Sequence, residues 1–136
     1  MKATLDHIGI AVGDIHASLG FFRDALGLDV DAPEDVPSQR VRVTFLPAGQ
    51  SSVELLEPTT PDSAVARHLS KRGAGMHHIA FRVDDIRAAL AELKARGVRL
   101  IDDVPRPGAH RSLVAFIHPS ATDGVLVELK QADAAR

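Results

Sequence analysis

Two histidines and two glutamates stand out as residues whose types and spacing could bind a metal ion. His7 is matched 71 residues later by His78, and Glu54 is matched 74 residues later by Glu128. Neutral imidazoles and carboxylates are ligands for divalent metals, and four of them leave one or two positions for water or substrate. Such an open site suits Lewis-acid catalysis. The sequence therefore predicts a divalent metal centre at His7, Glu54, His78 and Glu128.

Each of these residues has a simpler interpretation when it is considered alone. A single histidine that opens a strand usually has a structural role, and a single glutamate near a strand end is usually solvated. The metal site is favoured because the same histidine and glutamate recur at matching positions of a duplicated segment.

The duplication covers most of the chain. Its first segments are residues 5–15 (LDHIGIAVGDI) and 76–86 (MHHIAFRVDDI). Each copy continues into apolar residues at helical spacing, with Asp14 or Asp85 as the expected N-cap and Gly27 or Gly97 as the expected left-handed C-terminal residue. A strand is then expected to restart at residues 28–30 and 98–100. The last two strands also match, residues 43–46 with 114–117 and 52–55 with 126–129.

Each half is therefore predicted to be a βαβββ module. The predicted boundaries within a single domain of residues 1–136 are a first module at 3–57, a linker at 58–75 with a short helix over 62–70, a second module at 76–131 and a tail at 132–136. Neither half has enough apolar surface to be stable alone. The expected fold class is α+β, with two modules packed side by side in a curved mixed β-sheet that encloses the metal site.

Strand alternation predicts on which face the four candidate ligands lie. Neighbouring residues of a strand point to opposite faces, so if Ile8 and Ile10 face the helix over 14–26, His7 points to the other face. The same parity places His78 and both glutamates on the face away from the helices, which we expect to be concave. A buried carboxylate among apolar neighbours costs several kcal/mol unless it is compensated, and a cation is the simplest compensation.

Composition excludes several classes of protein. The chain contains no cysteine, so cysteine-ligated zinc, iron–sulfur clusters and thiolate nucleophiles are excluded. Sixteen Lys and Arg residues against eighteen Asp and Glu residues give a net charge of −2, and nucleic acid is not an expected partner. No apolar run approaches the ~20 residues of a membrane span, and the first residues do not form a signal peptide. A cytoplasmic protein without a membrane partner is expected.

Several segments carry a resemblance to a known family: residues 5–12, 36–41, 53–58, 76–86 and 124–129. On these segments the chain, over about residues 3–131, resembles the vicinal oxygen chelate superfamily and, within it, the methylmalonyl-CoA epimerases. The resemblance implies paired βαβββ modules around a metal held by His7, Glu54, His78 and Glu128. It favours Co²⁺, with Zn²⁺, Ni²⁺, Mn²⁺ or Mg²⁺ as alternatives, and it implies an acyl-CoA substrate and a homodimer.

The implied activity is that of a metal-dependent isomerase. It would interconvert 2R and 2S methylmalonyl-CoA by removing the C2 proton through an enolate, with Glu128 as the first choice for acid–base work and Glu54 as the second. Some members carry a further acidic residue, proposed as a base, at the position of Val43, so in this chain its role would fall to Glu54.

Three alternatives remain open. A glyoxalase I-type lyase, or another metal-dependent enzyme of the superfamily, can use the same four ligands and also moves a proton next to a carbonyl. A metal-free protein that binds a small molecule is less favoured, because all four ligand positions hold competent residues.

Four arginines are candidates for contacts with the phosphates of coenzyme A, because they are expected in loops or edge strands near the mouth of the site: Arg40, Arg42, Arg106 and Arg111. The simpler interpretation is that each is a solvated surface charge.

Overall fold

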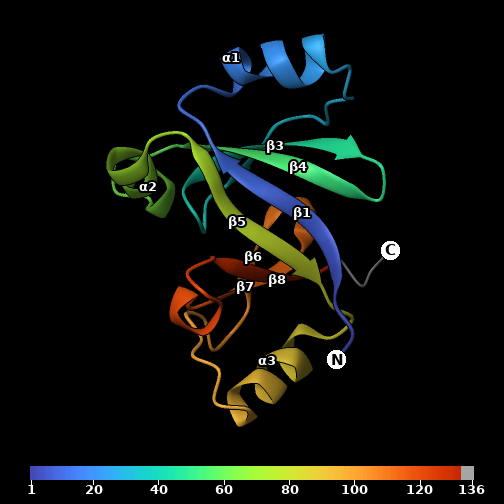
Figure 1. Ribbon diagram of the computed structural model, residues 1–136, viewed down its shortest axis with the longest axis vertical. Coiled ribbons are helices and arrows are strands. Elements are labelled where there is room, and N and C mark those ends of the chain that lie inside the picture. Colours follow the sequence, from blue (N-terminus) through green and yellow to red (C-terminus); the bar gives the residue numbers. More distant parts are fainter. Residues whose placement is uncertain (133–136) are drawn as a thin grey trace. The chain divides into compact units, whose positions relative to one another are not determined.

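The computed structural model describes residues 1–132, which form two compact units (Figure 1). The N-terminal unit comprises residues 7–77, and the C-terminal unit comprises residues 1–6 together with the chain from His78 onward. Only Ala132 of the predicted tail is described; residues 133–136 lie outside the described residues. Every helix of the described part is too short or too polar to cross a bilayer.

The first half of the chain has the predicted order of elements. They are β1 (Thr4–Ala11), α1 (Ile15–Leu19), a π-helical turn η1 (Gly20–Ala25), β2 (Glu34–Val36), β3 (Val41–Ala48), β4 (Ser51–Pro58) and α2 (Ala64–Arg72). The strand order is β2-β3-β4-β1. Strand β1 runs parallel to β4, and the other pairs are antiparallel, as the long neighbouring arrows of β3 and β4 show in Figure 1.

The second half repeats this plan. Its elements are β5 (Gly75–Arg82), α3 (Ile86–Ala95), β6 (Arg106–Pro107), β7 (Leu113–Ile117) and β8 (Val127–Gln131), with short 3₁₀ turns η2 (Ala109–Arg111) and η3 (Pro119–Ala121). The strand order is β5-β8-β7-β6, and β5 runs parallel to β8. Two βαβββ modules with mixed sheets are therefore present, as the duplication predicted.

The helix of each module packs on one face of its own sheet. In the N-terminal unit the buried cluster under α1 includes Val12, Ile15, Leu19, Leu46 and Leu55. In the C-terminal unit the cluster under α3 includes Val83, Ile86, Leu90, Ala115 and Leu129. These clusters confirm the predicted parity, because they contain the residues that alternate with the four candidate ligands.

The predicted helix ends are confirmed. The side chain of Asp14 accepts a hydrogen bond from the His16 amide, and that of Asp85 accepts one from the Ala88 amide. Gly27 and Gly97 have φ angles of 77° and 80°, the left-handed conformation that ends a helix. The linker helix is α2, two residues later than predicted.

Three local expectations differ from the structure. No strand restarts at residues 28–30: β2 lies at Glu34–Val36, and Val30 packs against the core beneath α1 instead of pairing as a strand. In the second half, Leu100 forms only an isolated bridge to Ile117, and the paired strand is β6. The first predicted helix is α-helical only as far as Leu19 and then continues with π-helical hydrogen bonds. Apolar side chains can fill a core without strand pairing, so hydrophobicity alone did not locate these strands.

Candidate metal centre

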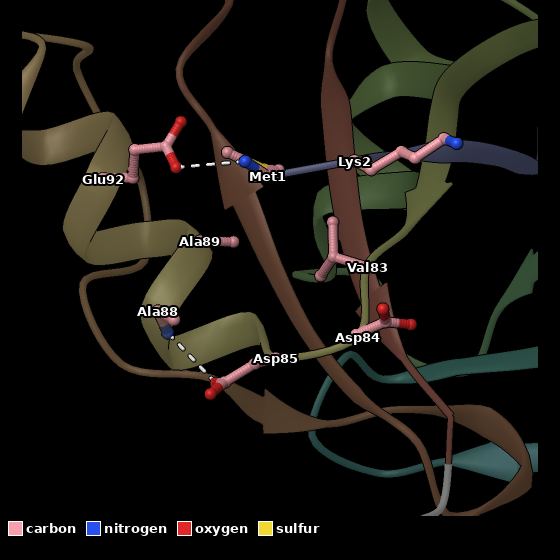
Figure 2. Close-up of a pocket in the computed structure, with 8 residues that line it drawn as sticks. All are labelled: Met1, Lys2, Val83, Asp84, Asp85, Ala88, Ala89 and Glu92. Atoms are coloured by element: carbon pink, nitrogen blue, oxygen red, sulfur yellow. Dashed lines mark hydrogen bonds and ion pairs between the residues drawn. The ribbon is translucent and has the colours of Figure 1, made fainter.

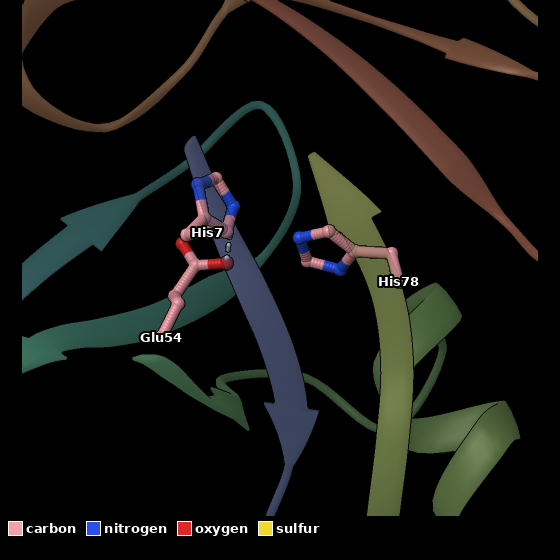
Figure 3. Close-up of side chains that lie close together, drawn as sticks. All are labelled: His7, Glu54 and His78. Carbon is pink, nitrogen blue, oxygen red and sulfur yellow. Dashed lines mark ion pairs between the residues drawn. The ribbon is translucent and has the colours of Figure 1, made fainter. Parts of the chain in front are cut away.

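His7 and Glu54 form a buried pair in the N-terminal unit. Strand β1 carries His7 and its parallel neighbour β4 carries Glu54, which lies opposite Gly9 in the register. The His7 Nε2 and Glu54 Oε1 atoms are 3.3 Å apart, and the two residues are only 1% and 6% exposed. Figure 3 shows the carboxylate turned toward the imidazole.

The C-terminal unit contains the corresponding pair. Strand β5 carries His78, and its parallel neighbour β8 carries Glu128 opposite Ala80. The His78 Nε2 and Glu128 Oε1 atoms are 3.5 Å apart, and the residues are 2% and 4% exposed. Each unit thus brings one predicted histidine and one predicted glutamate together, by the same pairing of parallel strands.

A phenylalanine packs against each histidine. The Phe45 ring lies edge-on to His7 at a centroid distance of 5.2 Å, and the Phe116 ring lies edge-on to His78 at 5.9 Å. Each phenylalanine also lies directly opposite the glutamate of its pair, Phe45 opposite Glu54 in the β3–β4 register and Phe116 opposite Glu128 in the β7–β8 register. In the sequence they belong to the matching strand segments 43–46 and 114–117. Their spacing of 71 residues and the strand parity together would have predicted a role beside the histidines.

The donor set of each pair fits a divalent metal ion. An imidazole nitrogen and a carboxylate oxygen that lie 3.3–3.5 Å apart can bind the same ion from neighbouring positions. His7, Glu54 and His78, drawn in Figure 3, all carry such ligand atoms and are all buried. Buried carboxylates require compensation by a positive charge, and a dication supplies it.

Asp6, which directly precedes His7 in the chain, belongs to the C-terminal unit. Its carboxylate accepts from the Lys130 ammonium at 3.2 Å, and the Arg82 guanidinium lies 3.5 Å from the other oxygen. Side chains of Asp6 and Lys130 are only 11% and 13% exposed, so this ion pair is largely shielded from water. None of its residues was among the candidates that the sequence indicated.

The arginines singled out in the sequence differ in their surroundings. Arg40 pairs with Asp62 at 2.6 Å and Arg42 pairs with Asp35 at 3.1 Å, and both side chains are more than half exposed. These two fit the interpretation of surface charges. Arg106 is more enclosed and lies over the ring of Phe116, 5.7 Å from its centroid.

A further histidine contact involves His77, the residue directly before the candidate ligand His78. His68 of α2 packs edge-on against His77, with ring centroids 5.0 Å apart. Desolvation by its surroundings and, secondarily, the positive charge of Arg72 lower the pKa of His68 below its ordinary value of 6.5.

Val43 occupies the position where the family resemblance implied an additional acid. It is 2% exposed and pairs with Leu56 on β4 and Glu34 on β2. Its partner Glu34 places a carboxylate directly beside this position on the edge strand.

A cavity of about 240 Å³ lies on the α3 side of the C-terminal unit (Figure 2). It is lined by Met1, Lys2, Val83, Asp84, Asp85, Ala88, Ala89 and Glu92. The terminal ammonium of Met1 lies 3.2 Å from Oε1 of Glu92, and this ion pair joins two residues of the cavity lining. Val83 and Ala89 belong to the core beneath α3, so this cavity is on the sheet face opposite the one that carries Glu128.

Comparison with known proteins supplies the family. Residues 6–116 match the Glyoxalase/Bleomycin resistance protein/Dioxygenase superfamily. The chain belongs to this superfamily. Within the superfamily, it is 47% identical to the uncharacterized protein YqjC of Bacillus subtilis, over 92% of this chain and 89% of that protein.

Other superfamily relatives have known activities. The ethylmalonyl-CoA/methylmalonyl-CoA epimerase of Cereibacter sphaeroides is 41% identical over 96% of this chain and 99% of its own length. A solved structure of a methylmalonyl-CoA epimerase in complex with methylmalonyl-CoA and NH₄⁺ is 41% identical and superposes with a TM-score of 0.93, covering 98% of this chain and 97% of that one. The superfamily fold expected from the sequence is thereby confirmed.

Proposed function

We propose that this protein is a methylmalonyl-CoA epimerase, which interconverts the 2R and 2S forms by moving the proton on C2. The observation that carries the proposal is the buried His–Glu pair, repeated at equivalent positions of both units. The epimerases that match nearly the whole chain at 41% identity support the same substrate class. The alternative function, a glyoxalase I-type lyase, has less support.

We further propose that His7, Glu54, His78 and Glu128 together hold one divalent ion. In favour of this are the burial of all four residues, the identical strand placement of the two pairs and the need of each carboxylate for a cation. The family resemblance favours Co²⁺. When bound, the ion supplies positive charge that stabilises the negative charge developing on the thioester carbonyl oxygen.

The glutamates are the groups that move the proton. Inversion at C2 requires that a proton is removed from one side of the carbon and delivered to the other. Glu128 and Glu54 come from different units, one carboxylate for each transfer, and we assign the principal acid–base role to Glu128. A carboxylate that held a dication would be a weak base, so the glutamate that transfers the proton would have to be the one that the ion holds less tightly.

The surroundings of each glutamate favour this role. Phe116 opposite Glu128 and Phe45 opposite Glu54 exclude water from one side of each carboxylate. With little water beside the carboxylates, the second glutamate rather than a water molecule can deliver the proton to the opposite side of C2, and both glutamates can exchange their protons with the solvent between turnovers.

Exchange of the C2 hydrogen tests the function directly. Metal-loaded protein is incubated with one epimer of methylmalonyl-CoA in deuterated water, and the product is followed by mass spectrometry and chiral analysis. We expect deuterium at C2 together with racemisation. Absence of exchange with every divalent ion tried would refute the proposal.

We also propose, from the family resemblance, that the protein acts as a homodimer in the cytoplasm. Light scattering on the purified, metal-loaded protein measures its mass, and a value equal to one chain would refute the dimer.

A further inference from the structure

Arg106 lies on the same sheet face as the candidate ligands of the C-terminal unit. It pairs with Val114 in the β6–β7 register, and Val114 alternates with Ala115 and Ile117 of the core beneath α3. Phe116 and its partner Glu128 share the face of Val114. The Arg106 side chain therefore extends from the face that carries Glu128.

Two neighbours fix the position of the guanidinium. Its carbon lies 5.7 Å from the centroid of the Phe116 ring, within the range of a cation–π contact. Its Nε lies 3.3 Å from Oδ1 of Asp102, and the other Asp102 oxygen accepts a hydrogen bond of 2.8 Å from the Phe116 amide. Since the Phe116 ring also contacts His78, a single aromatic residue connects Arg106 to a candidate metal ligand.

The corresponding position of the other unit holds a residue of opposite charge. Val43 and Val114 are equivalent in the repeat, and the edge-strand partner of Val43 is Glu34, whereas that of Val114 is Arg106. The arginine is therefore not a remnant of the duplicated plan. At this repeat position only the C-terminal unit carries a positive charge, as expected if one end of the ligand is anionic.

A guanidinium held in this way recognises a planar anion. A guanidinium presents five N–H donors in a fixed fork, and it matches a carboxylate with two parallel hydrogen bonds. Its side chain is 37% exposed, so a ligand can reach it while part of its charge is shielded from water.

We propose that Arg106 binds the free carboxylate of the acyl group and thereby selects 2-carboxyacyl thioesters over simple acyl thioesters. This inference rests on the proposed epimerase function and names a residue that determines its substrate class. This role differs from a contact with the phosphates of coenzyme A, because a phosphate contact would strengthen the binding of every acyl-CoA equally.

Binding of two acyl-CoA probes separates these possibilities. Malonyl-CoA carries the free carboxylate and acetyl-CoA lacks it, and both are titrated calorimetrically into the metal-loaded protein. We expect Arg106→Gln to weaken malonyl-CoA binding by about 10- to 100-fold, as for the loss of hydrogen bonds to a charged group, and to change acetyl-CoA binding by less than about twofold. Arg106→Lys, which keeps the charge but not the fork, should give an intermediate loss.

The matched control is Arg96→Gln. Arg96 follows α3, is 70% exposed and pairs with Glu92, so the same substitution there should leave both affinities unchanged. Thermal unfolding checks that each variant is folded. If Arg106→Gln is not folded, Arg106→Lys supplies the comparison.

Equal weakening of both probes would assign Arg106 to the coenzyme A portion and overturn the proposal, as would unchanged binding of both. The wild-type exchange assay is separate: if wild-type protein shows no C2 exchange, the epimerase function fails whatever Arg106 does.

Discussion

Glu128 is the residue whose replacement separates binding from chemistry. It is 4% exposed and lies 3.5 Å from His78, with Phe116 opposite it in the sheet. The Glu128→Gln variant has nearly the same shape, and we expect it to fold normally and to retain part of its metal affinity. Turnover should fall by about 10²- to 10⁴-fold, because an amide cannot accept the C2 proton.

Racemisation of a single epimer, measured together with metal affinity and the unfolding midpoint, checks this expectation. Glu92→Gln is the matched control, since Glu92 is a more exposed glutamate whose ion pairs involve Met1 and Arg96. Wild-type turnover in Glu128→Gln would remove Glu128 from the mechanism and leave Glu54 as the principal acid–base residue.

His68 is expected to make stability depend on pH. Its lowered pKa means that the unfolded chain binds a proton at a higher pH than the folded chain does. Stability should therefore fall as the pH falls through 6.5 toward the folded-state pKa, and should recover as the pH rises. In thermal unfolding between pH 7.5 and 5.5, His68→Gln should show a smaller loss of midpoint than wild type.

His16 provides the control for this measurement. It is an exposed histidine of α1, and His16→Gln should keep the wild-type dependence on pH. If His68→Gln has the same pH dependence as wild type, desolvation and the charge of Arg72 do not lower the pKa of His68 enough to affect stability.

Side chains at the ends of two strands connect each sheet to its helix. In the N-terminal unit the Ile15 amide donates to Glu57 Oε1 at 2.9 Å, and in the C-terminal unit the Ile86 amide donates to Gln131 Oε1 at 2.8 Å. Glu57 and Gln131 are equivalent in the repeat, at the spacing of Glu54 and Glu128. Each satisfies an otherwise unpaired donor at the start of a helix.

Removal of these acceptors should destabilise the fold without direct damage to the metal ligands. We expect Glu57→Ala to cost about 1–2 kcal/mol and Gln131→Ala to cost about 1 kcal/mol, because a carboxylate interacts more favourably than an amide with a helix N-terminus. Glu57→Gln, which keeps the acceptor, should lose only a few tenths of a kcal/mol. Urea unfolding measures all three, and a Glu57→Ala variant as stable as wild type would show that the bond contributes nothing.

The elements that could be predicted from the sequence are those with a periodic or repeated signal. The βαβββ order, the capping aspartates and the parity of His7 and His78 all follow from the duplication and the alternation of apolar residues. The short edge strands could not be placed, because β2 and β6 contain only three and two residues and have no period of their own. The π-helical turn after Leu19 depends on hydrogen bonds that the apolar spacing does not encode.

Contacts that depend on tertiary neighbours were likewise missed. Nothing in the local sequence of Glu57 or Gln131 indicates that each reaches a helix amide more than 40 residues away. Arg106 was recognised only as a possible phosphate contact, because its packing on Phe116 becomes evident only from the β6–β7 pairing.

At the scale of the whole molecule, the central question is whether the two His–Glu pairs act as one site. Each pair, with two protein ligands, would by itself leave a divalent ion mostly hydrated and weakly held. Four ligands from two units would bind one ion much more tightly, since the second pair acts at high effective concentration once the first has bound. The proposed function requires this second arrangement, because both glutamates must reach the same substrate carbon.

Metal stoichiometry distinguishes the two arrangements. We expect calorimetric titration with Co²⁺ to give one ion per chain, and His7→Ala and His78→Ala each to reduce the affinity by a large factor even though they change different units. A concentration 100 times the dissociation constant should stabilise the wild-type fold by about 2.7 kcal/mol, and either variant should lose most of that gain at the same concentration. Independent pairs would instead give two ions per chain in wild type, and His7→Ala would leave the site at His78 and Glu128 with unchanged affinity.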